Sequence, residues 1–313
     1  MTVTPVRFPA LDGYVLGGFL HTGADQEPVH AVVFATGGGI RAEAYRHFLS
    51  YLASHGIAVL AFDYRGIGES RPPQLRGFVA GFEDWAEYDA GGAIAWMAAR
   101  YPKASLTGMG HSIGALMIGA STTATALTQL VLIAPHTGYH GDYAFAVRWM
   151  VRFAWRVAGP SLRSAFGYFP ARMLRLGEDL PARVALQWAG YVSPEMPLGI
   201  DDGDHQRERR LLDHMSSLHK RALVVSIDDD PWATENGVRR AMHAYRNLTI
   251  VRRVIQSLPG QTKLGHWDFF RRRMSGLLWP FALHFIKSPS DQGRHTSALA
   301  AEGRSYEHDA AQT

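Results

Sequence analysis

The sequence predicts an α/β protein whose mostly parallel, doubly wound sheet is covered by helices and interrupted by a helical insertion. Three observations carry this prediction. Short apolar runs, typical of strands buried on both faces, alternate with stretches of helical periodicity. The alternation stops between residues 136 and 220, where no convincing strand occurs. It then resumes and continues to about residue 287, which completes the pattern of one interrupted α/β unit.

The composition agrees with a globular α/β protein and excludes several classes of site. Hydrophobic content of 47% and charged content of 19% over 313 residues are typical of soluble domains. No apolar run reaches the ~18 residues of a membrane span, and the N-terminus lacks the apolar core of a signal peptide, so we expect a cytoplasmic protein with no integral membrane segment. The absence of cysteine excludes disulfides and thiolate metal sites. A diffuse net charge of +4 does not indicate nucleic-acid binding.

The first part of the chain supplies the predicted edge and centre of the sheet. Two β-like runs, 6–10 and 14–22, are joined at Asp12-Gly13, which is a hairpin signal. Buried strands are predicted at 30–35, 57–63, 104–109 and 129–134, and helices at 42–55, 82–100 and 115–120. Residues 1–135 are therefore expected to form the first part of the core.

The second part of the chain contains the insertion and the end of the sheet. Helix-like stretches at 143–158, 180–191 and 207–219 predict a helical cap over residues 136–220. Strands at 221–227 and 248–255, with helices at 236–245 and 274–286, return the chain to the core, which ends at residue 287. Pro280 is expected to interrupt the last helix. The polar composition of residues 288–313 predicts a disordered tail.

The pentapeptide Gly110-His111-Ser112-Ile113-Gly114 lies between a predicted strand and a predicted helix. A serine in this G-x-S-x-G pattern occupies a strained, exposed turn, and its flanking glycines allow the turn to be tight. A dinucleotide-binding loop is the alternative for such a glycine-rich turn. That loop needs G-x-G-x-x-G, and Gly108, Gly110 and Gly114 miss the spacing by one residue.

Three chemically competent residues follow three predicted parallel strands. Ser112 follows a strand in the middle of the predicted sheet, aspartates at 228–230 follow a later strand, and His266 follows the last. The carboxyl ends of parallel strands meet at one edge of a sheet, where such folds build their sites. The order Ser, Asp, His is that of the α/β-hydrolase triad.

With these motifs the chain resembles the α/β-hydrolase superfamily from about residue 6 to residue 287. The segment TGGGIRAEAYRHF is similar to the H-G-x-G loop of that family, although Thr36 replaces the usual histidine. DYRGIGES is similar to its D-x-x-G-x-G-x-S, and GHWDFF to its G-H-x-x-F-F. Among subfamilies the sequence most resembles the monoglyceride-lipase and serine-aminopeptidase-like esterases.

The resemblance implies a catalytic triad of Ser112, Asp230 and His266. A serine hydroxyl needs a base within hydrogen-bond reach, and His266 is the expected base. Asp228, Asp229 and Asp230 all compete to orient it; the family spacing after the strand selects Asp230, with Asp229 as the alternative. His111, beside the nucleophile, is interpreted as a packing residue.

The remaining site residues are expected to stabilise the oxyanion and to bind the substrate. The backbone N–H of Ile113 follows the nucleophile, and alignment with H-G-x-G makes Gly38 the second donor. An apolar pocket is predicted from Trp149, Phe153 and Trp155 in the cap. No metal or organic cofactor is expected, since Asp202-Gly203-Asp204 lacks the full spacing of a calcium loop.

These features predict a serine hydrolase that cleaves small to medium lipophilic carboxylic esters through an acyl-enzyme on Ser112. The partner is then a small-molecule ester. The same triad also suits an acyltransferase, a thioesterase or an amidase, because only the group that reaches the acyl-enzyme differs. A non-catalytic binding protein of the same fold is the alternative from another class.

Overall fold

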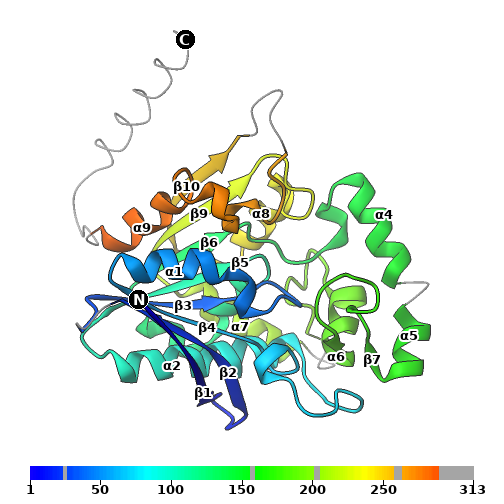
Figure 1. The fold of residues 1–313 in the computed structure, drawn as a ribbon. Coiled ribbons are helices and arrows are strands. Elements are labelled where there is room, and N and C mark those ends of the chain that lie inside the picture. Colours follow the sequence, from blue (N-terminus) through cyan, green and yellow to red (C-terminus); the bar gives the residue numbers. More distant parts are fainter. Residues whose placement is uncertain (24–26, 156–158, 201–204, 257–262, 289–313) are drawn as a thin grey trace.

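A mixed sheet forms the centre of the molecule (Figure 1). The computed structural model describes residues 1–23, 27–155, 159–200, 205–256 and 263–288, and within these residues eight strands form one sheet in the order β1-β2-β4-β3-β5-β6-β9-β10. The strands are β1 (Thr2–Pro9), β2 (Val15–Thr22), β3 (His30–Ala35), β4 (Ile57–Phe62), β5 (Ser105–His111), β6 (Gln129–Ile133), β9 (Arg221–Ile227) and β10 (Thr249–Ile255).

The pairing of the strands matches the predicted α/β-hydrolase fold. β1 pairs antiparallel with β2, and β2 pairs antiparallel with β4, as the hairpin signal at Asp12-Gly13 predicts. Every neighbouring pair from β4 to β10 is parallel. The carboxyl ends of β3, β5, β6, β9 and β10 therefore lie along one edge of the sheet.

Helices cover the sheet on both faces. They are α1 (Arg46–Ser54), α2 (Gly91–Arg100), α3 (Gly114–Ala120), α7 (Gln206–Ser216), α8 (Glu235–Met242) and α9 (Trp279–Lys287). α1 and α9 lie together on one face, where Tyr51 and Phe48 contact the ring of Trp279, and α2 lies on the other side of the strands (Figure 1). The apolar stripe of each helix is thus buried against the sheet.

Two helix boundaries differ from those that the sequence predicts. The chain from residue 84 to 90 forms a π-helical turn before α2 begins. Pro280 does not interrupt the closing helix but lies in its first turn, because α9 begins at Trp279. A proline suits this position, where its missing N–H has no partner to lose.

The segment between β6 and β9 contains α4 (Phe145–Phe153), α5 (Gly159–Phe166), α6 (Ala182–Leu186) and α7. It also contains the short antiparallel pair β7 (Tyr168–Phe169) and β8 (Leu180–Pro181), which the sequence does not reveal because each strand has only two residues. α4, α5, α6 and β7 gather beside the sheet (Figure 1), whereas α7 packs on α3, which itself packs on β5. Residues 289–313, the predicted tail, lie outside the described part of the chain.

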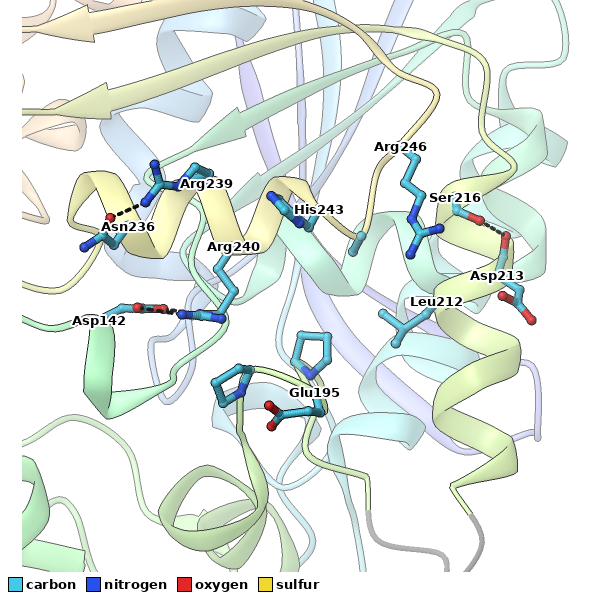
Figure 2. Close-up of a pocket in the computed structure, with 13 residues that line it drawn as sticks. Asp142, Glu195, Leu212, Asp213, Ser216, Asn236, Arg239, Arg240, His243 and Arg246 are labelled. Carbon is cyan, nitrogen blue, oxygen red and sulfur yellow. Dashed lines mark hydrogen bonds and ion pairs between the residues drawn. The ribbon is translucent and has the colours of Figure 1, made fainter.

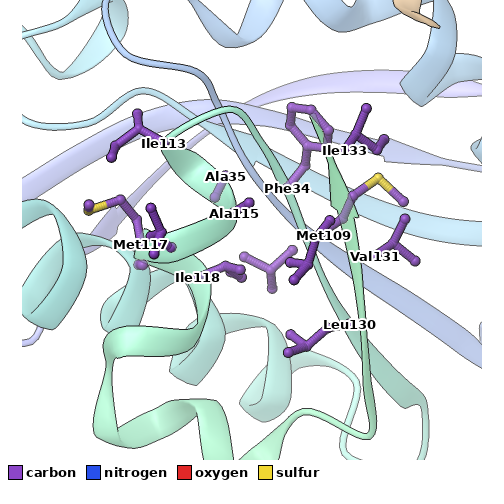
Figure 3. Packing of buried hydrophobic residues seen from close by; sticks show 14 of the residues in the cluster. Phe34, Ala35, Met109, Ile113, Ala115, Met117, Ile118, Leu130, Val131 and Ile133 are labelled. Atoms are coloured by element: carbon purple, nitrogen blue, oxygen red, sulfur yellow. The ribbon is translucent and has the colours of Figure 1, made fainter. Parts of the chain in front are cut away.

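The turn between β5 and α3 is the most constrained part of the core. Ser112 has a φ of 59°, which is in the left-handed region. A Cβ on Gly110 would lie 2.4 Å from the carbonyl oxygen of Gly114, and a Cβ on Gly114 would lie 2.4 Å from the carbonyl oxygens of Ala35 and Thr36. Both glycines are required because those neighbours are backbone atoms that cannot move aside. Figure 3 shows α3 seated on the buried side chains of β3, β5 and β6, among them Phe34, Met109 and Val131.

Gly114→Ala is expected to lower the free energy of unfolding by about 1–3 kcal/mol, as overpacking in a tight core does. Gly276→Ala is the matched control, because a Cβ there meets no atom within 4 Å. Urea denaturation of the two variants checks this. Equal stability of Gly114→Ala and Gly276→Ala would contradict the packing described for the turn.

Candidate active site

Ser112 lies on the turn that follows β5, with its side chain almost fully buried. Its backbone N–H donates to the carbonyl of Ile133, at 2.9 Å, which fixes the turn to the end of β6. Its hydroxyl oxygen lies 2.8 Å from Nε2 of His136. Ser112 is 7% exposed and His136 is 3% exposed, so water does not compete strongly for this contact.

The buried Asp230 and the half-buried His266 form a second polar pair. Nδ1 of His266 lies 2.7 Å from Oδ2 of Asp230. The other oxygen of Asp230 accepts the backbone N–H groups of Trp232 and Ala233, at 2.8 and 2.9 Å. Burial would raise the pKa of Asp230, but His266 and these two N–H groups hold it below its usual value. The carboxylate is therefore charged and fixes the orientation of the imidazole.

The neighbouring carboxylate has a different partner. Asp229 accepts the backbone N–H groups of Leu264 and Gly265, at 2.9 and 2.7 Å. It holds the loop that carries His266 but does not contact the imidazole in any described interaction. Of the two aspartates that the sequence leaves open, the geometry favours Asp230 as the partner of His266.

The structure gathers the three predicted residues but adds a fourth between them. The sequence predicts a hydrogen bond between Ser112 and His266, whereas the side-chain partner of the serine hydroxyl within the described residues is His136. The ring centres of His136 and His266 are 5.3 Å apart, so the two imidazoles are neighbours. Ser112 therefore contacts His136, and the ring of His136 neighbours the imidazole that Asp230 holds.

His136 is the site residue that the sequence analysis misses. It follows β6, which is the neighbour of β5 in the sheet, and so it leaves the same carboxyl edge as Ser112. That position after a parallel strand was the available signal, since histidine in such a loop is a candidate for catalysis. No short motif marks it, because Pro135-His136-Thr137 fits no pattern used above.

His111 does more than pack. Its Nδ1 lies 2.9 Å from the hydroxyl of Tyr45, which accepts the N–H of Gly37 at 2.9 Å. Its Nε2 lies 3.2 Å from the carbonyl oxygen of His266. A carbonyl can only accept, so Nε2 carries the proton and Nδ1 accepts the proton of Tyr45. This chain of hydrogen bonds connects the loop after β3, the turn that carries Ser112 and the loop that carries His266.

The two predicted oxyanion donors lie side by side. A Cβ on Gly38 would lie 3.3 Å from a methyl carbon of Ile113. Within the described part of the chain, neither backbone N–H donates to a protein acceptor. Unpaired backbone N–H groups are the kind of donor that stabilises a developing negative charge on a substrate oxygen.

An apolar cavity adjoins this region. Its volume is about 110 Å³, which is below the roughly 300–1,000 Å³ of sites that enclose drug-sized ligands. Its walls come from the loop after β3, from the segment between β6 and β9 and from the loop after β9: Gly38, Gly39, Met150, Val151, Ala154, Trp155, Phe169, Ala171, Leu176, Glu178, Leu180, Trp188 and Trp232. Trp188 also lines a smaller pocket that contains Ser112 and His136. The cavity and the serine therefore share one wall.

The three residues predicted to form the pocket are Trp149 and Phe153 on α4 and Trp155 just after it, and they do not all face the same way. Trp155 lines the cavity, together with Val151 and Ala154. Trp149 and Phe153 are 55% and 65% exposed and do not line it, so their assignment to the pocket is corrected. Residues four apart lie on one side of a helix, and 149 and 153 share the outer side with Phe145. The sequence could not fix which side of this helix faces the core, because both sides carry aromatic residues.

A larger hollow lies elsewhere in the described structure. It is formed by α7, α8 and the chain around Glu195, as Figure 2 shows, and its volume is about 520 Å³. Charged groups line it, including Arg239, Arg246 and Asp213, and Arg240 is paired with Asp142. None of the candidate catalytic residues contributes to it. Its size therefore does not make it the active site.

Neither a metal site nor a membrane helix is found among the described residues. No three histidine, aspartate or glutamate side chains gather there to hold an ion. Residues 201–204, where the calcium-loop pattern was tested, lie outside the described residues. None of the described helices combines the length and apolar character needed to span a bilayer.

Solved structures with a similar fold are esterases and a peptidase. An esterase from Pyrococcus furiosus is 16% identical with a TM-score of 0.56, over 91% of this chain and 92% of that chain. An esterase from Pyrobaculum calidifontis is 20% identical with a TM-score of 0.56, over 91% and 84%. The acylaminoacyl peptidase of Pyrococcus horikoshii is 14% identical with a TM-score of 0.56, over 96% of this chain and 43% of that chain. At these identities the likeness establishes the fold.

Sequence comparison establishes the family. No curated protein matches the sequence. Residues 26–254 match the family described as serine aminopeptidase, S33. This match covers well over half of the chain and includes Ser112 and Asp230, whereas His266 lies beyond its end. The chain belongs to the serine aminopeptidase S33 family of α/β-hydrolases.

Proposed function

We propose that this chain is a serine hydrolase that cleaves carboxylic esters of small to medium lipophilic molecules through an acyl-enzyme on Ser112. The observation that carries the proposal is the Asp230–His266 pair, whose imidazole neighbours the ring of His136 at 5.3 Å, while His136 contacts a serine in the left-handed region. An imidazole that donates Nδ1–H to a carboxylate has a free lone pair on Nε2, which is what a general base requires.

In the proposed reaction, Ser112 attacks the ester carbonyl while its proton passes to Nε2 of His266. The carbonyl electron pair moves to oxygen, where the N–H groups of Gly38 and Ile113 stabilise the charge. His266 then gives the proton to the departing alcohol, and the acyl group remains on the serine. Water then attacks the acyl-enzyme in the same way, with His266 as the base, and the carboxylic acid is released.

The hydroxyl proton of Ser112 must point to His266 before the serine reacts. In this structure the hydroxyl oxygen lies 2.8 Å from Nε2 of His136. The hydroxyl hydrogen can rotate about the Cβ–Oγ bond while the oxygen keeps its place, so this adjustment needs no change in the backbone or in the contact with His136. The conformation described here is then a resting state of the proposed enzyme.

The apolar cavity supports a lipophilic substrate. Its lining includes Trp155, Phe169, Leu176 and Leu180, and it begins at Gly38, the proposed oxyanion donor. An acyl or alcohol chain placed there would be about 0.8 kcal/mol more stable for each buried methylene. We assign residues 136–220 to a cap on a core made of 1–135 and 221–287, because residues of this segment form most of the cavity wall.

Cleavage of peptides or amides is the second candidate, because the family takes its name from an aminopeptidase. An aminopeptidase needs an acidic group to bind the amino end of its substrate, and Glu178 is the carboxylate of the cavity. Both oxygens of Glu178 already contact the guanidinium of Arg172, at 3.0 and 2.8 Å. With this charge neutralised, the cavity favours a neutral ester.

Ser112→Ala is expected to reduce hydrolysis of p-nitrophenyl butyrate by more than about 10³-fold, because the nucleophile is removed.

Asp230→Asn should lower kcat by up to about 10⁴-fold, as the loss of the orienting carboxylate does in other triads. Steady-state kinetics on each variant, with circular dichroism to check folding, provide the measurement.

Asp229→Asn is the matched control for Asp230→Asn, since both replace one carboxylate in the same turn. It should lose much less activity, because Asp229 bonds to loop backbone and not to the imidazole. A larger loss of activity in Asp229→Asn than in Asp230→Asn would show that Asp229, and not Asp230, orients the imidazole.

Hydrolysis of aminoacyl p-nitroanilides at rates well above those of the esters would favour the peptidase.

Ala154→Trp is expected to lower kcat/KM for a decanoate ester at least tenfold more than for an acetate ester. The larger side chain would fill the apolar cavity, and hydrophobic pockets discriminate by about tenfold or more for each methylene that no longer fits. Phe145→Ala is the control, since Phe145 is 76% exposed on the outer side of α4. An equal fall with both esters in Ala154→Trp would show that this cavity does not bind the chain.

A further inference from the structure

The hydrogen bonds of His136 define which of its nitrogens carries the proton. Nδ1 accepts the backbone N–H of Gly138 at 2.9 Å. A backbone N–H can only donate, so Nδ1 holds a lone pair and, in the neutral ring, Nε2 holds the proton. Nε2 lies 2.8 Å from the hydroxyl oxygen of Ser112. His136 is therefore the donor in this contact and the serine oxygen is the acceptor.

A second proton does not fit on His136. It would have to occupy Nδ1, where it would face the N–H of Gly138. Burial, followed by the charge of the neighbouring His266, lowers the pKa of His136 to about 3. Asp230 acts in the opposite direction but does not offset these effects. The ring remains neutral across the pH range in which His266 could act as a base.

The turn that holds His136 is itself fixed by the wall of the apolar cavity. The hydroxyl of Tyr143 donates to the carbonyl of Gly138 at 2.9 Å. The indole N–H of Trp188 donates to the hydroxyl of Tyr143 at 3.2 Å. Trp188 lines both the cavity and the pocket at Ser112. Gly138 is thus held at both of its backbone groups: its N–H donates to His136, and its carbonyl accepts from Tyr143.

The two histidines beside Ser112 have opposite roles in hydrogen bonding. His266 directs its Nδ1–H to Asp230 and offers a lone pair at Nε2, whereas His136 offers a proton at Nε2. His136 cannot accept the serine proton, because its own Nε2 is already protonated. Accepting a hydrogen bond from His136 leaves the O–H of Ser112 free to be donated to His266.

We propose that His136 is a second catalytic histidine, a fixed neutral donor to the reacting oxygen of Ser112 that does not take part in proton transfer. This inference rests on the proposed function of Ser112. During attack, the bond from Oγ to the acyl carbon forms, the serine proton moves to His266, and His136 keeps its proton. When water attacks the acyl carbon, a proton of the water passes to His266 and the carbonyl electron pair moves to oxygen. As this intermediate collapses, the bond from the acyl carbon to Oγ breaks, His266 gives the proton to Oγ, and the N–H of His136 stabilises the departing oxygen.

Two substitutions separate the two nitrogens of this ring. His136→Gln places an amide N–H near the position of Nε2 and loses the acceptor for Gly138. His136→Asn places an acceptor near the position of Nδ1 and loses the donor to Ser112. The measurements are the rate of fluorophosphonate labelling, the deacylation rate in a p-nitrophenyl ester burst assay, and the pH profile of kcat/KM.

Deacylation is expected to fall about 10- to 100-fold in His136→Asn, the effect of losing a hydrogen bond to a charged oxygen, and less than tenfold in His136→Gln. The acid limb of the pH profile should remain where it is in His136→Gln, because His136 does not titrate. That result is independent of whether the Asn variant folds.

Three results would overturn the proposal while leaving the proposed function intact. A greater loss in the Gln variant than in the Asn variant would mean that His136 only shapes the turn at Gly138. Loss of the acid limb in His136→Gln would mean that His136 is the base. Rates equal to those of the wild type in both variants would show that His136 has no role in catalysis. Failure of the wild type to label with fluorophosphonate would instead contradict the proposed function and this inference together.

Discussion

The backbone conformation of Ser112 is the constraint on which the candidate site depends. Its φ of 59° turns the chain sharply from β5 into α3, and this is possible only because Gly110 and Gly114 lack side chains. The approach of Gly114 to the carbonyls of Ala35 and Thr36 also sets the distance between the serine and the loop after β3. A strained backbone of this kind persists only where the surrounding packing determines it.

Parallel strand order brings the other groups to the same place. Residues 36–39 follow β3, His136 follows β6, the aspartates follow β9, and the loop of His266 follows β10. His111, at the end of β5, then links two of these loops: it reaches Gly37 through Tyr45 on one side and the carbonyl of His266 on the other. Segments that are far apart in sequence are thus held by buried hydrogen bonds, each of which is stronger in this dry environment than in water.

Much of this arrangement could be predicted from residue order alone. The turn at Ser112, the strand pattern and the pairing of an aspartate with His266 each follow from spacing that the fold requires. The choice between Asp229 and Asp230 needed the structure, because both follow the same strand and differ only in the direction of their side chains. Packing also determines which side of α4 faces the cavity, and this separates Trp155 from Trp149 and Phe153.

His136 was not predictable for a different reason. Its contribution depends on which ring nitrogen is protonated, and that follows from a backbone N–H two residues later. A short pattern of residue types cannot encode this. The same limit applies to His111, whose position beside the nucleophile gave no indication that both of its nitrogens are bonded.

An activated serine is the central claim, and covalent labelling tests it most directly. Wild type and Ser112→Ala would be treated with a fluorophosphonate and their intact masses compared. One adduct on the wild type and none on Ser112→Ala is the predicted result, because labelling requires both a base and an oxyanion site at that hydroxyl. An unmodified wild type, or an adduct that persists in Ser112→Ala, would contradict the proposed mechanism.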